Sequence, residues 1–150
     1  MANERTQLIQ SDLKGKSLLL YDGDCAFCQF WVNFILKRDK RKHFLFAPLQ
    51  IQGSSDLCRD NGIEPNGKSV LILDDVGLSE KSTAVLRICS KLGGVWLAFS
   101  ILGIFIPKFF RDWLYVLVAQ RRKSISKHMI SFCRVPTLEE KKRFLDQLPG

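Results

Sequence analysis

The sequence lacks an apolar run long enough to cross a membrane. Its longest uncharged stretch, Leu92–Pro107, has sixteen residues with glycines at 93, 94 and 103, whereas a spanning helix needs about 20 apolar residues. We therefore expect a buried helix here and no membrane span, with a membrane-inserted helix as the alternative. The first sixteen residues also lack the apolar segment of a secretory signal. This absence predicts a cytoplasmic protein.

The sequence is poor in histidine, and its five cysteines do not form two close pairs. A cytoplasmic compartment keeps thiols reduced, which argues against a framework of disulfides. Structural zinc takes four ligands, commonly from two close pairs. Beyond Cys25 and Cys28, the candidate ligands are far apart in the chain: His43, Cys58, Cys89, His128 and Cys133. A redox-active pair without metal or other cofactor is therefore favoured, and a zinc-binding module remains the alternative.

The composition is that of a globular chain rather than a disordered or fibrous one. Of the 150 residues, 46% are apolar and 25% are charged, and a chain of this length can bury a core without disulfides. We expect a single domain over residues 1–150. The net charge of +8 raises the question of an anionic partner.

Two basic runs, Lys37–His43 and Arg121–Lys127, carry part of this charge. Both fall at expected helix ends, where cations complement the helix dipole. A solvent-exposed basic face is favoured over contact with nucleic acid or an anionic membrane surface. We expect no specific nucleic-acid partner, and an anion-binding module stays as the main non-catalytic alternative.

Apolar periodicity predicts an α/β fold. Short continuous apolar runs indicate buried strands, and apolar residues three and four positions apart indicate helices. The expected strands are 17–21, 44–47, 70–73 and a short one after the turn at 74–77; the expected helices are 25–38, 51–61, one capped by Ser82, 95–106, 111–122 and one beginning at Thr137. Residues 17–93 therefore follow the order β-α-β-α-β-β-α of a thioredoxin-like core. Residues 94–150 form a C-terminal helical extension packed on it.

The expected chemistry lies in the stretch YDGDCAFC, where the first strand leads into the first helix. Cys25, in the first helical turn, faces unpaired backbone N–H groups and the positive end of the dipole, both of which favour the thiolate that attacks disulfides. Cys28 lies three residues later on the same side of the helix. We assign Cys25 as nucleophile and Cys28 as resolving thiol. Cys28 is expected to be the more buried because it flanks Trp31, an expected core residue.

Two acidic residues flank the pair. Asp22 and Asp24 disfavour a nearby thiolate through like charge, which predicts a reducing pair and hence a protein-disulfide reductase. Asp22 is a candidate proton acceptor for the resolving thiol, or alternatively a turn residue, and Asp24 is expected to cap the helix. The expected partners are a disulfide-containing protein or small thiol substrate and a reductant that recycles the pair.

This motif resembles the opening pattern of the DCC family of predicted thiol–disulfide oxidoreductases, Tyr-Asp-Gly-x-Cys-x-x-Cys, which is matched by Tyr21, Asp22, Gly23, Cys25 and Cys28. The similarity covers about residues 18–136 and includes Arg38-Asp39, Ser82-Thr83-Ala84, Leu92–Trp96, Pro107, Tyr115–Ala119, Cys133 and Pro136. The chain has Arg122-Lys123 where the family often has Arg-Tyr. The resemblance implies a thioredoxin-like fold and redox activity, but no particular substrate.

Thioredoxins carry a cis-proline just before the third strand, where it helps to bind the substrate backbone. Lys68 and Ser69 precede Val70 at that place in this chain. We expect Ser69, together with Tyr21 and Gly23 of the motif, to contribute to substrate binding.

A competing hypothesis uses the acidic residues. Asp22 and Asp24 after one apolar strand, with Asp74 and Asp75 after another, resemble the motifs of haloacid-dehalogenase-type phosphotransferases, which hold Mg²⁺. Ala26 departs from that signature, and a hairpin turn explains Asp74-Asp75 more simply.

The remaining thiols are assigned by their neighbours. Cys58 and Cys89 lie among apolar residues and are expected to be small core residues. Cys133 follows Phe132 after a basic helix, and we hypothesise that it is an auxiliary thiol that passes electrons to the Cys25–Cys28 pair.

Overall fold

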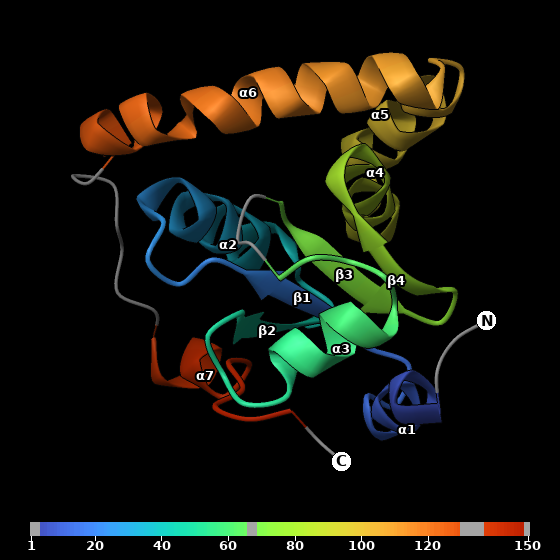
Figure 1. Cartoon of the computed structure of the whole chain (residues 1–150), viewed down its shortest axis with the longest axis vertical. Coiled ribbons are helices and arrows are strands. Elements are labelled where there is room, and N and C mark those ends of the chain that lie inside the picture. The colour runs from blue at the N-terminus through green and yellow to red at the C-terminus, as the bar shows by residue number, and fades with distance from the viewer. Residues whose placement is uncertain (1–3, 66–68, 130–136, 149–150) are drawn as a thin grey trace.

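A four-stranded mixed sheet carries helices on both of its faces (Figure 1). The computed structural model describes residues 4–65, 69–129 and 137–148. The elements are, in chain order, α1 Glu4–Asp12, β1 Ser17–Tyr21, α2 Ala26–Arg38, β2 Phe44–Pro48, α3 Ser54–Asp60, β3 Leu71–Asp74, β4 Gly77–Glu80, α4 Lys81–Leu92, α5 Val95–Ile104, α6 Lys108–Met129 and α7 Leu138–Lys141.

The strands lie in the order β2-β1-β3-β4. β1 and β2 run parallel, with Ser17 beside Phe44 and Tyr21 beside Pro48. β3 runs antiparallel to β1 and forms a hairpin with β4. From β1 to α4 the chain follows the β-α-β-α-β-β-α order, which is consistent with the predicted thioredoxin-like core. Parallel pairing makes the carboxyl ends of β1 and β2 meet at one end of the sheet.

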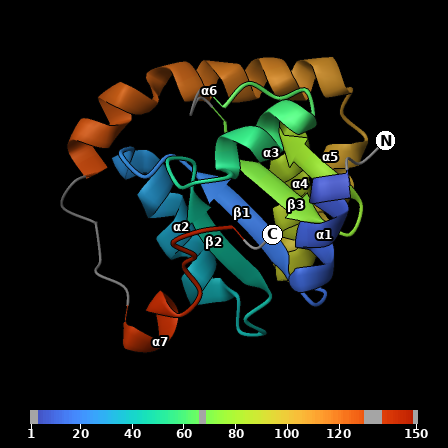
Figure 2. The ribbon, with the colours of Figure 1, turned by 60° about the horizontal axis from the view of Figure 1, so that its bottom comes forward.

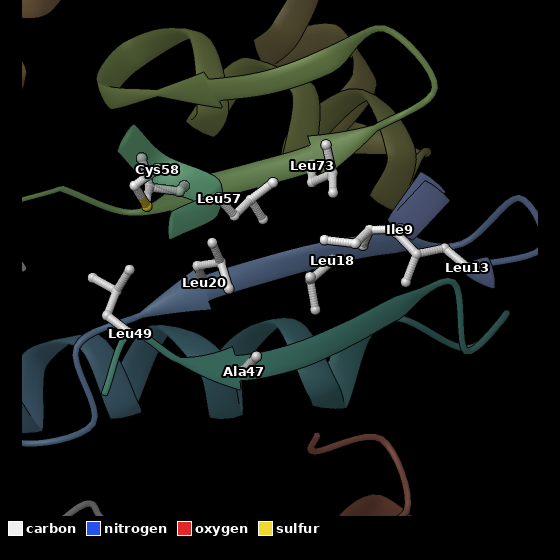
Figure 3. Packing of buried hydrophobic residues seen from close by; sticks show 10 residues of the cluster. Ile9, Leu13, Leu18, Leu20, Ala47, Leu49, Leu57, Cys58 and Leu73 are labelled. Atoms are coloured by element: carbon white, nitrogen blue, oxygen red, sulfur yellow. The ribbon is translucent and has the colours of Figure 1, made fainter. Parts of the chain in front are cut away.

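The central strand β1 is buried on both faces. Leu18 and Leu20 point to one side and Leu19 and Tyr21 to the other, because successive side chains of a strand alternate. The first side packs against α1 and α3 in a cluster that includes Leu57 (Figure 3). The second side packs against α2 and α4. The result is three layers, helix pair on sheet on helix pair, which Figure 2 shows from another side.

The C-terminal residues cover the outer edge of β2. The Phe46 N–H donates to the Arg143 carbonyl over 2.8 Å, and the Leu145 N–H donates to the Phe46 carbonyl over 2.8 Å. The Arg143 guanidinium forms a buried ion pair with Asp39, whose carboxylate also accepts the backbone N–H groups of His43 and Phe44. This network ties the end of α2, the start of β2 and the C-terminal segment together.

The predicted elements agree with the structure, with shifts at their ends. The third helix begins at Ser54 rather than 51, and α6 begins at Lys108 and continues beyond Arg122 to Met129. The predicted cap at Ser82 is wrong, because Glu80 precedes the first helical residue and the Ser82 hydroxyl donates to Asp112 on α6 instead. The helix predicted to begin at Thr137 is present, and Thr137 and Glu140 form a capping box at its start.

No signal in the sequence predicts α1. Its buried apolar positions are Ile9 on the helix and Leu13 just after it, one turn apart. The polar Thr6 is buried as well and accepts a hydrogen bond from Asn61 over 2.9 Å. A pattern of so few apolar residues is too weak to mark an amphipathic helix.

The prediction that Leu92–Pro107 forms a buried helix is wrong. α5 is exposed over much of its surface, and only Ser100 among its residues is buried. It packs beside α4 and continues into α6, which lies across α2 and α4 on the side away from the sheet (Figure 1). No helix among residues 4–65, 69–129 and 137–148 has the length and apolar character needed to cross a membrane.

Candidate active site at the start of α2

Cys25 caps the helix that follows it. Its backbone is extended, with φ −98° and ψ 108°, and its Sγ accepts the Cys28 N–H over 3.4 Å. The sulfur thus takes the place that a serine or aspartate oxygen usually fills. The predicted cap at Asp24 is therefore wrong. The Cys25 sulfur thus lies at the N-terminal end of α2, beside the backbone of its first turn.

Cys28 is held in a more apolar setting. Its thiol packs against the core cluster on the α2 side of the sheet and lies in contact with Cys25. Burial raises the pKa of Cys28 to about 12, and the hydrogen bond with Cys25 and the charge of that residue add to the shift. A backbone hydrogen bond with Asp22 and the charge of Arg122 act in the opposite direction. At neutral pH Cys28 is therefore a protonated thiol.

The expectation that Trp31 is a core residue beside Cys28 is wrong. Trp31 is 43% exposed, and the buried residues of α2 are Val32, Ile35 and Leu36. Phe27, Phe30 and Phe34 make edge-to-face contacts with Trp31, and all but Phe30 line an apolar cavity between α2 and α6. The apolar residues of α2 that were expected in the core thus lie partly between α2 and α6.

Gln50 holds the loop that leads into the cysteines, and sequence reasoning missed it. Its Oε1 accepts the Gly23 N–H over 3.1 Å, and its Nε2 donates to Asp22 Oδ1 over 2.9 Å and to Asp24 Oδ2 over 3.4 Å. Gln50 stands two residues after β2, which ends beside β1. The signal that would have revealed it is the parallel order of these two strands, because it brings the residues after each strand together.

Gly23 lies close to the same segment. A Cβ at this position would come to 3.1 Å from Gln50 Oε1 and 3.4 Å from Pro48 Cβ. Its carbonyl accepts a hydrogen bond from Gln29 Nε2 over 2.5 Å. Gly23 therefore permits the close approach of the loop to the end of β2.

The other two residues expected at the substrate site have structural contacts. Tyr21 is 8% exposed, and its ring packs edge-on against Phe144. The Ser69 hydroxyl donates to Glu80 over 3.4 Å. Ser69 lies two residues before β3, whose printed pairing with β1 ends with Leu71 beside Leu20.

An apolar cavity of about 380 Å³ lies beside Cys28. Its walls come from the sheet, α2, α4, α5 and α6, and they include Tyr21, Cys28 and Cys89. From α6, the Tyr115 hydroxyl oxygen accepts a hydrogen bond from the Val70 N–H over 3.0 Å, and Arg122 adds a positive charge near Cys28. Neither residue has a sequence signal linking it to a cysteine some ninety positions earlier.

The remaining thiols divide into three cases. Cys58 is fully buried, as predicted, and burial raises its pKa to about 11. Cys89 is only half-buried and lies on the cavity wall. Cys133 lies outside the described residues. Within residues 4–65, 69–129 and 137–148, no three His, Cys, Asp or Glu side chains are grouped as metal ligands would be.

The phosphotransferase hypothesis is incompatible with the sheet. β3 is antiparallel to β1 with Leu73 beside Leu18, so Asp74 lies at the start of β1. Asp22 and Asp24 follow the other end of that strand. Asp74 is instead buried in an ion pair with Arg87, at 2.9 Å. The two acidic pairs cannot share one Mg²⁺.

Comparison with known proteins finds a matching family model and two similar proteins. A family model described as DCC1-like thiol-disulfide oxidoreductase matches residues 19–128. The "Uncharacterized protein YuxK" of Bacillus subtilis (strain 168) is 34% identical over 130 residues, which cover 85% of this chain and 93% of the relative. The "DCC family protein At1g52590, chloroplastic" of Arabidopsis thaliana is 30% identical over 108 residues, covering 71% of this chain and 63% of the relative. No solved structure matches the chain.

Proposed function

The chain belongs to the DCC1-like thiol–disulfide oxidoreductase family, and from this premise we propose that it is a protein-disulfide reductase with Cys25 as nucleophile and Cys28 as resolving thiol. The observation that carries the proposal is the asymmetry of the pair. Cys25 Sγ accepts a backbone N–H at the helix start, whereas burial raises the pKa of Cys28 to about 12. Disulfide exchange needs one attacking thiolate and one thiol held in reserve.

The reaction proceeds in two exchanges. The Cys25 thiolate attacks one sulfur of the substrate disulfide, forms a mixed disulfide and releases the other sulfur as a thiolate. Cys28 then gives up its proton and attacks Cys25 Sγ, which forms the Cys25–Cys28 disulfide and releases the second substrate thiolate. The substrate gains two electrons and the pair loses two, so a thiol reductant must reduce the pair before the next turnover.

The reducing direction is supported by the charges around the pair. A strongly oxidising pair needs a strongly stabilised thiolate in its reduced form. Here Asp22 and Asp24 contribute two carboxylates to the loop before Cys25, and the contact that favours the thiolate is a backbone N–H at 3.4 Å. We therefore propose a potential nearer to about −270 mV, as in thioredoxin, than to about −120 mV, as in DsbA.

Asp22 is the proposed proton acceptor for Cys28. Its backbone is in hydrogen-bonding contact with the Cys28 thiol, and its carboxylate is positioned by Gln50. A protonated thiol needs such a base to become the attacking thiolate at neutral pH. Gly23, Ser69 and Tyr21 are proposed to contribute to substrate binding by shaping the surface beside the cysteines, since the Gly23 N–H and carbonyl are already bonded to Gln50 and Gln29.

The test is a disulfide-reductase assay with the wild type, Cys25→Ser and Cys28→Ser. Cys25→Ser should lose activity, and Cys28→Ser should accumulate a mixed disulfide through Cys25 that is visible by mass under non-reducing conditions. Cys58→Ser is the matched control and should keep the wild-type rate. Equal turnover by all variants would refute the role of Cys25 and Cys28 as the catalytic pair. Equilibration with glutathione buffers measures the reduction potential of the pair and so tests the reducing direction.

A further inference from the structure

Most of the exposed large apolar side chains gather on α5, on α6 and on the corner between them. Of the twenty that the described residues expose, fifteen lie between Val95 and Val118. Phe105 at the corner is 82% exposed and Phe109 is 76% exposed. An exposed apolar surface of this extent marks an interaction site in a water-exposed protein. The exposed apolar side chains of residues 95–118 are called the α5–α6 face below.

The length of α5 limits what this face does. Ser100 is the only hydroxyl- or charge-bearing residue among its ten, and the Ser100 hydroxyl is already bound to the Leu86 carbonyl. A helix that is apolar on all sides is normally covered by protein or by lipid. Ten residues span about 15 Å, half of the roughly 30 Å hydrocarbon core of a bilayer. The helix is therefore long enough to enter one leaflet and too short to cross both.

The charge of the chain is concentrated in the same layer. Residues Lys81–Met129, which form α4, α5 and α6, contain nine lysines and arginines and one acidic residue, Asp112. The rest of the chain has fourteen residues of each sign. The whole net charge of +8 thus resides in these three helices. The Asp112 carboxylate accepts a hydrogen bond from the Ser82 hydroxyl.

The cations are unevenly placed within the layer. The three on α4 pair with acidic residues of the β3–β4 region: Lys81 with Glu80, Arg87 with Asp74, and Lys91 with Asp75. The other six belong to α6. The helix that carries the aromatic Phe109, Phe110 and Trp113 in its first two turns therefore also carries most of the excess positive charge.

From these observations we propose that the α5–α6 face docks on an anionic phospholipid bilayer. An apolar and aromatic surface joined to a cationic helix has the features of an interfacial helix, which lies in the plane of the headgroups. The corner around Phe105 and Phe109 enters the acyl boundary, and the exposed Lys108 and Arg121 of α6 reach the phosphate groups. A second copy docked by the same face would instead bring two layers of like charge together.

Flotation with vesicles tests the proposal. The full-length reduced protein should float with vesicles of phosphatidylcholine and phosphatidylglycerol, bind those of phosphatidylcholine alone more weakly, and be released by high salt. Phe105→Ser combined with Phe109→Ser should lower the partition coefficient on the order of tenfold or more. Val76→Ser, which removes an apolar side chain that is 71% exposed on the β3–β4 turn, is the matched control and should bind as the wild type does.

Two double charge reversals distinguish the effect of the charge on α6 from the effect of the net charge of the chain. Lys108→Glu with Arg121→Glu changes exposed residues of α6, and Lys40→Glu with Arg41→Glu changes the net charge equally on the loop before β2. Only the first pair should weaken binding strongly. Trp113 fluorescence should shift to the blue with anionic vesicles, and Trp113→Phe should lose most of that shift.

Three results would overturn the proposal: wild-type protein that stays in the aqueous fraction at low salt, equal weakening by both charge reversals, or a stable dimer that Phe105→Ser with Phe109→Ser dissociates without any vesicle binding. The reductase assay uses a soluble disulfide and no lipid. The result of the reductase assay therefore does not depend on whether the protein binds vesicles.

Discussion

Gln50 holds Asp22 across the end of two parallel strands, with 2.9 Å between Gln50 Nε2 and Asp22 Oδ1. The same side chain accepts the Gly23 N–H over 3.1 Å, so one residue fixes both the acid and the backbone of the loop before Cys25. The two contacts come from residues 27 and 28 positions apart in the chain. The position of the cysteine loop therefore depends on the pairing of β1 with β2.

Replacing Gln50 tests this dependence. Gln50→Ala should lower kcat/KM for disulfide reduction on the order of tenfold, because small displacements of reacting groups are costly. The free energy of unfolding should fall by about 1 kcal/mol, since the lost hydrogen bonds are solvent-exposed. Gln52→Ala, an exposed glutamine of the same loop, is the control. Equal rates for the two variants would show that the Gln50 contacts are not needed.

Asp22→Asn tests the proposed proton acceptor. The amide keeps the size of the side chain but accepts no proton, so resolution of the mixed disulfide at neutral pH should slow on the order of a hundredfold. Attack by Cys25 should not slow, because the change removes a negative charge near its thiolate. The slow step should recover as pH rises, because hydroxide replaces the base, and rapid-quench trapping of the mixed disulfide measures it. Asp24→Asn should resolve at the wild-type rate; a similar defect there would point to loop charge instead.

The raised pKa values of Cys28 and Cys58 make stability depend on alkaline pH. Burial raises the pKa of Cys28 to about 12, above the ordinary value near 9 that it has when unfolded. Its contribution to stability is therefore fully present below pH 9 and is lost as pH rises from about 9 towards 12, because only the unfolded chain releases the proton. Urea unfolding across this range should show a shallower decline for Cys28→Ala than for the wild type.

Cys58 provides the comparison for that experiment. Burial raises its pKa to about 11, so its contribution is lost over the narrower range between about 9 and 11. Cys58→Ala should flatten the decline less than Cys28→Ala does. A decline as steep in Cys28→Ala as in the wild type would mean that the Cys28 thiol is not shielded from water in the folded state.

The ion pair of Asp39 and Arg143 predicts a large loss of stability when it is broken. Asp39→Asn should lower the free energy of unfolding by about 3 to 5 kcal/mol, because the Arg143 guanidinium is then buried without its counter-charge. Asp56→Asn breaks the exposed pair with Arg5, 3.3 Å apart, and should change stability by less than about 1 kcal/mol. Chemical denaturation of both variants measures the difference, and similar losses would contradict the role of burial.

The elements that the sequence predicted well share a local cause. The runs at 17–21 and 44–47 are continuous and apolar because both faces of these strands are covered. Cys25 and Cys28 could be assigned to a helix start because the aromatic and aliphatic residues after them have helical spacing. These signals lie within a few residues of the feature they predict.

The features that the sequence did not predict depend on contacts between distant segments of the chain or with another molecule. Gln50, Tyr115 and Arg122 reach the cysteine region only because the sheet and α6 bring separate segments together. The apolar composition of α5 predicts that something covers it, but it does not distinguish the protein's own core from an outside partner. That ambiguity made a buried helix the expected result, whereas α5 lies on the surface.

The cap of α2 is the same sulfur that enters the reaction. In the reduced protein the Cys28 N–H is satisfied by Cys25 Sγ. Once Cys25 is joined to substrate, its sulfur carries no negative charge and is a weaker acceptor, so the first turn of α2 loses its end restraint. Cys28, whose side chain must swing towards Cys25, sits in that turn. Formation of the mixed disulfide thus loosens the first turn of α2, which has to rearrange before Cys28 can attack Cys25 and release the substrate.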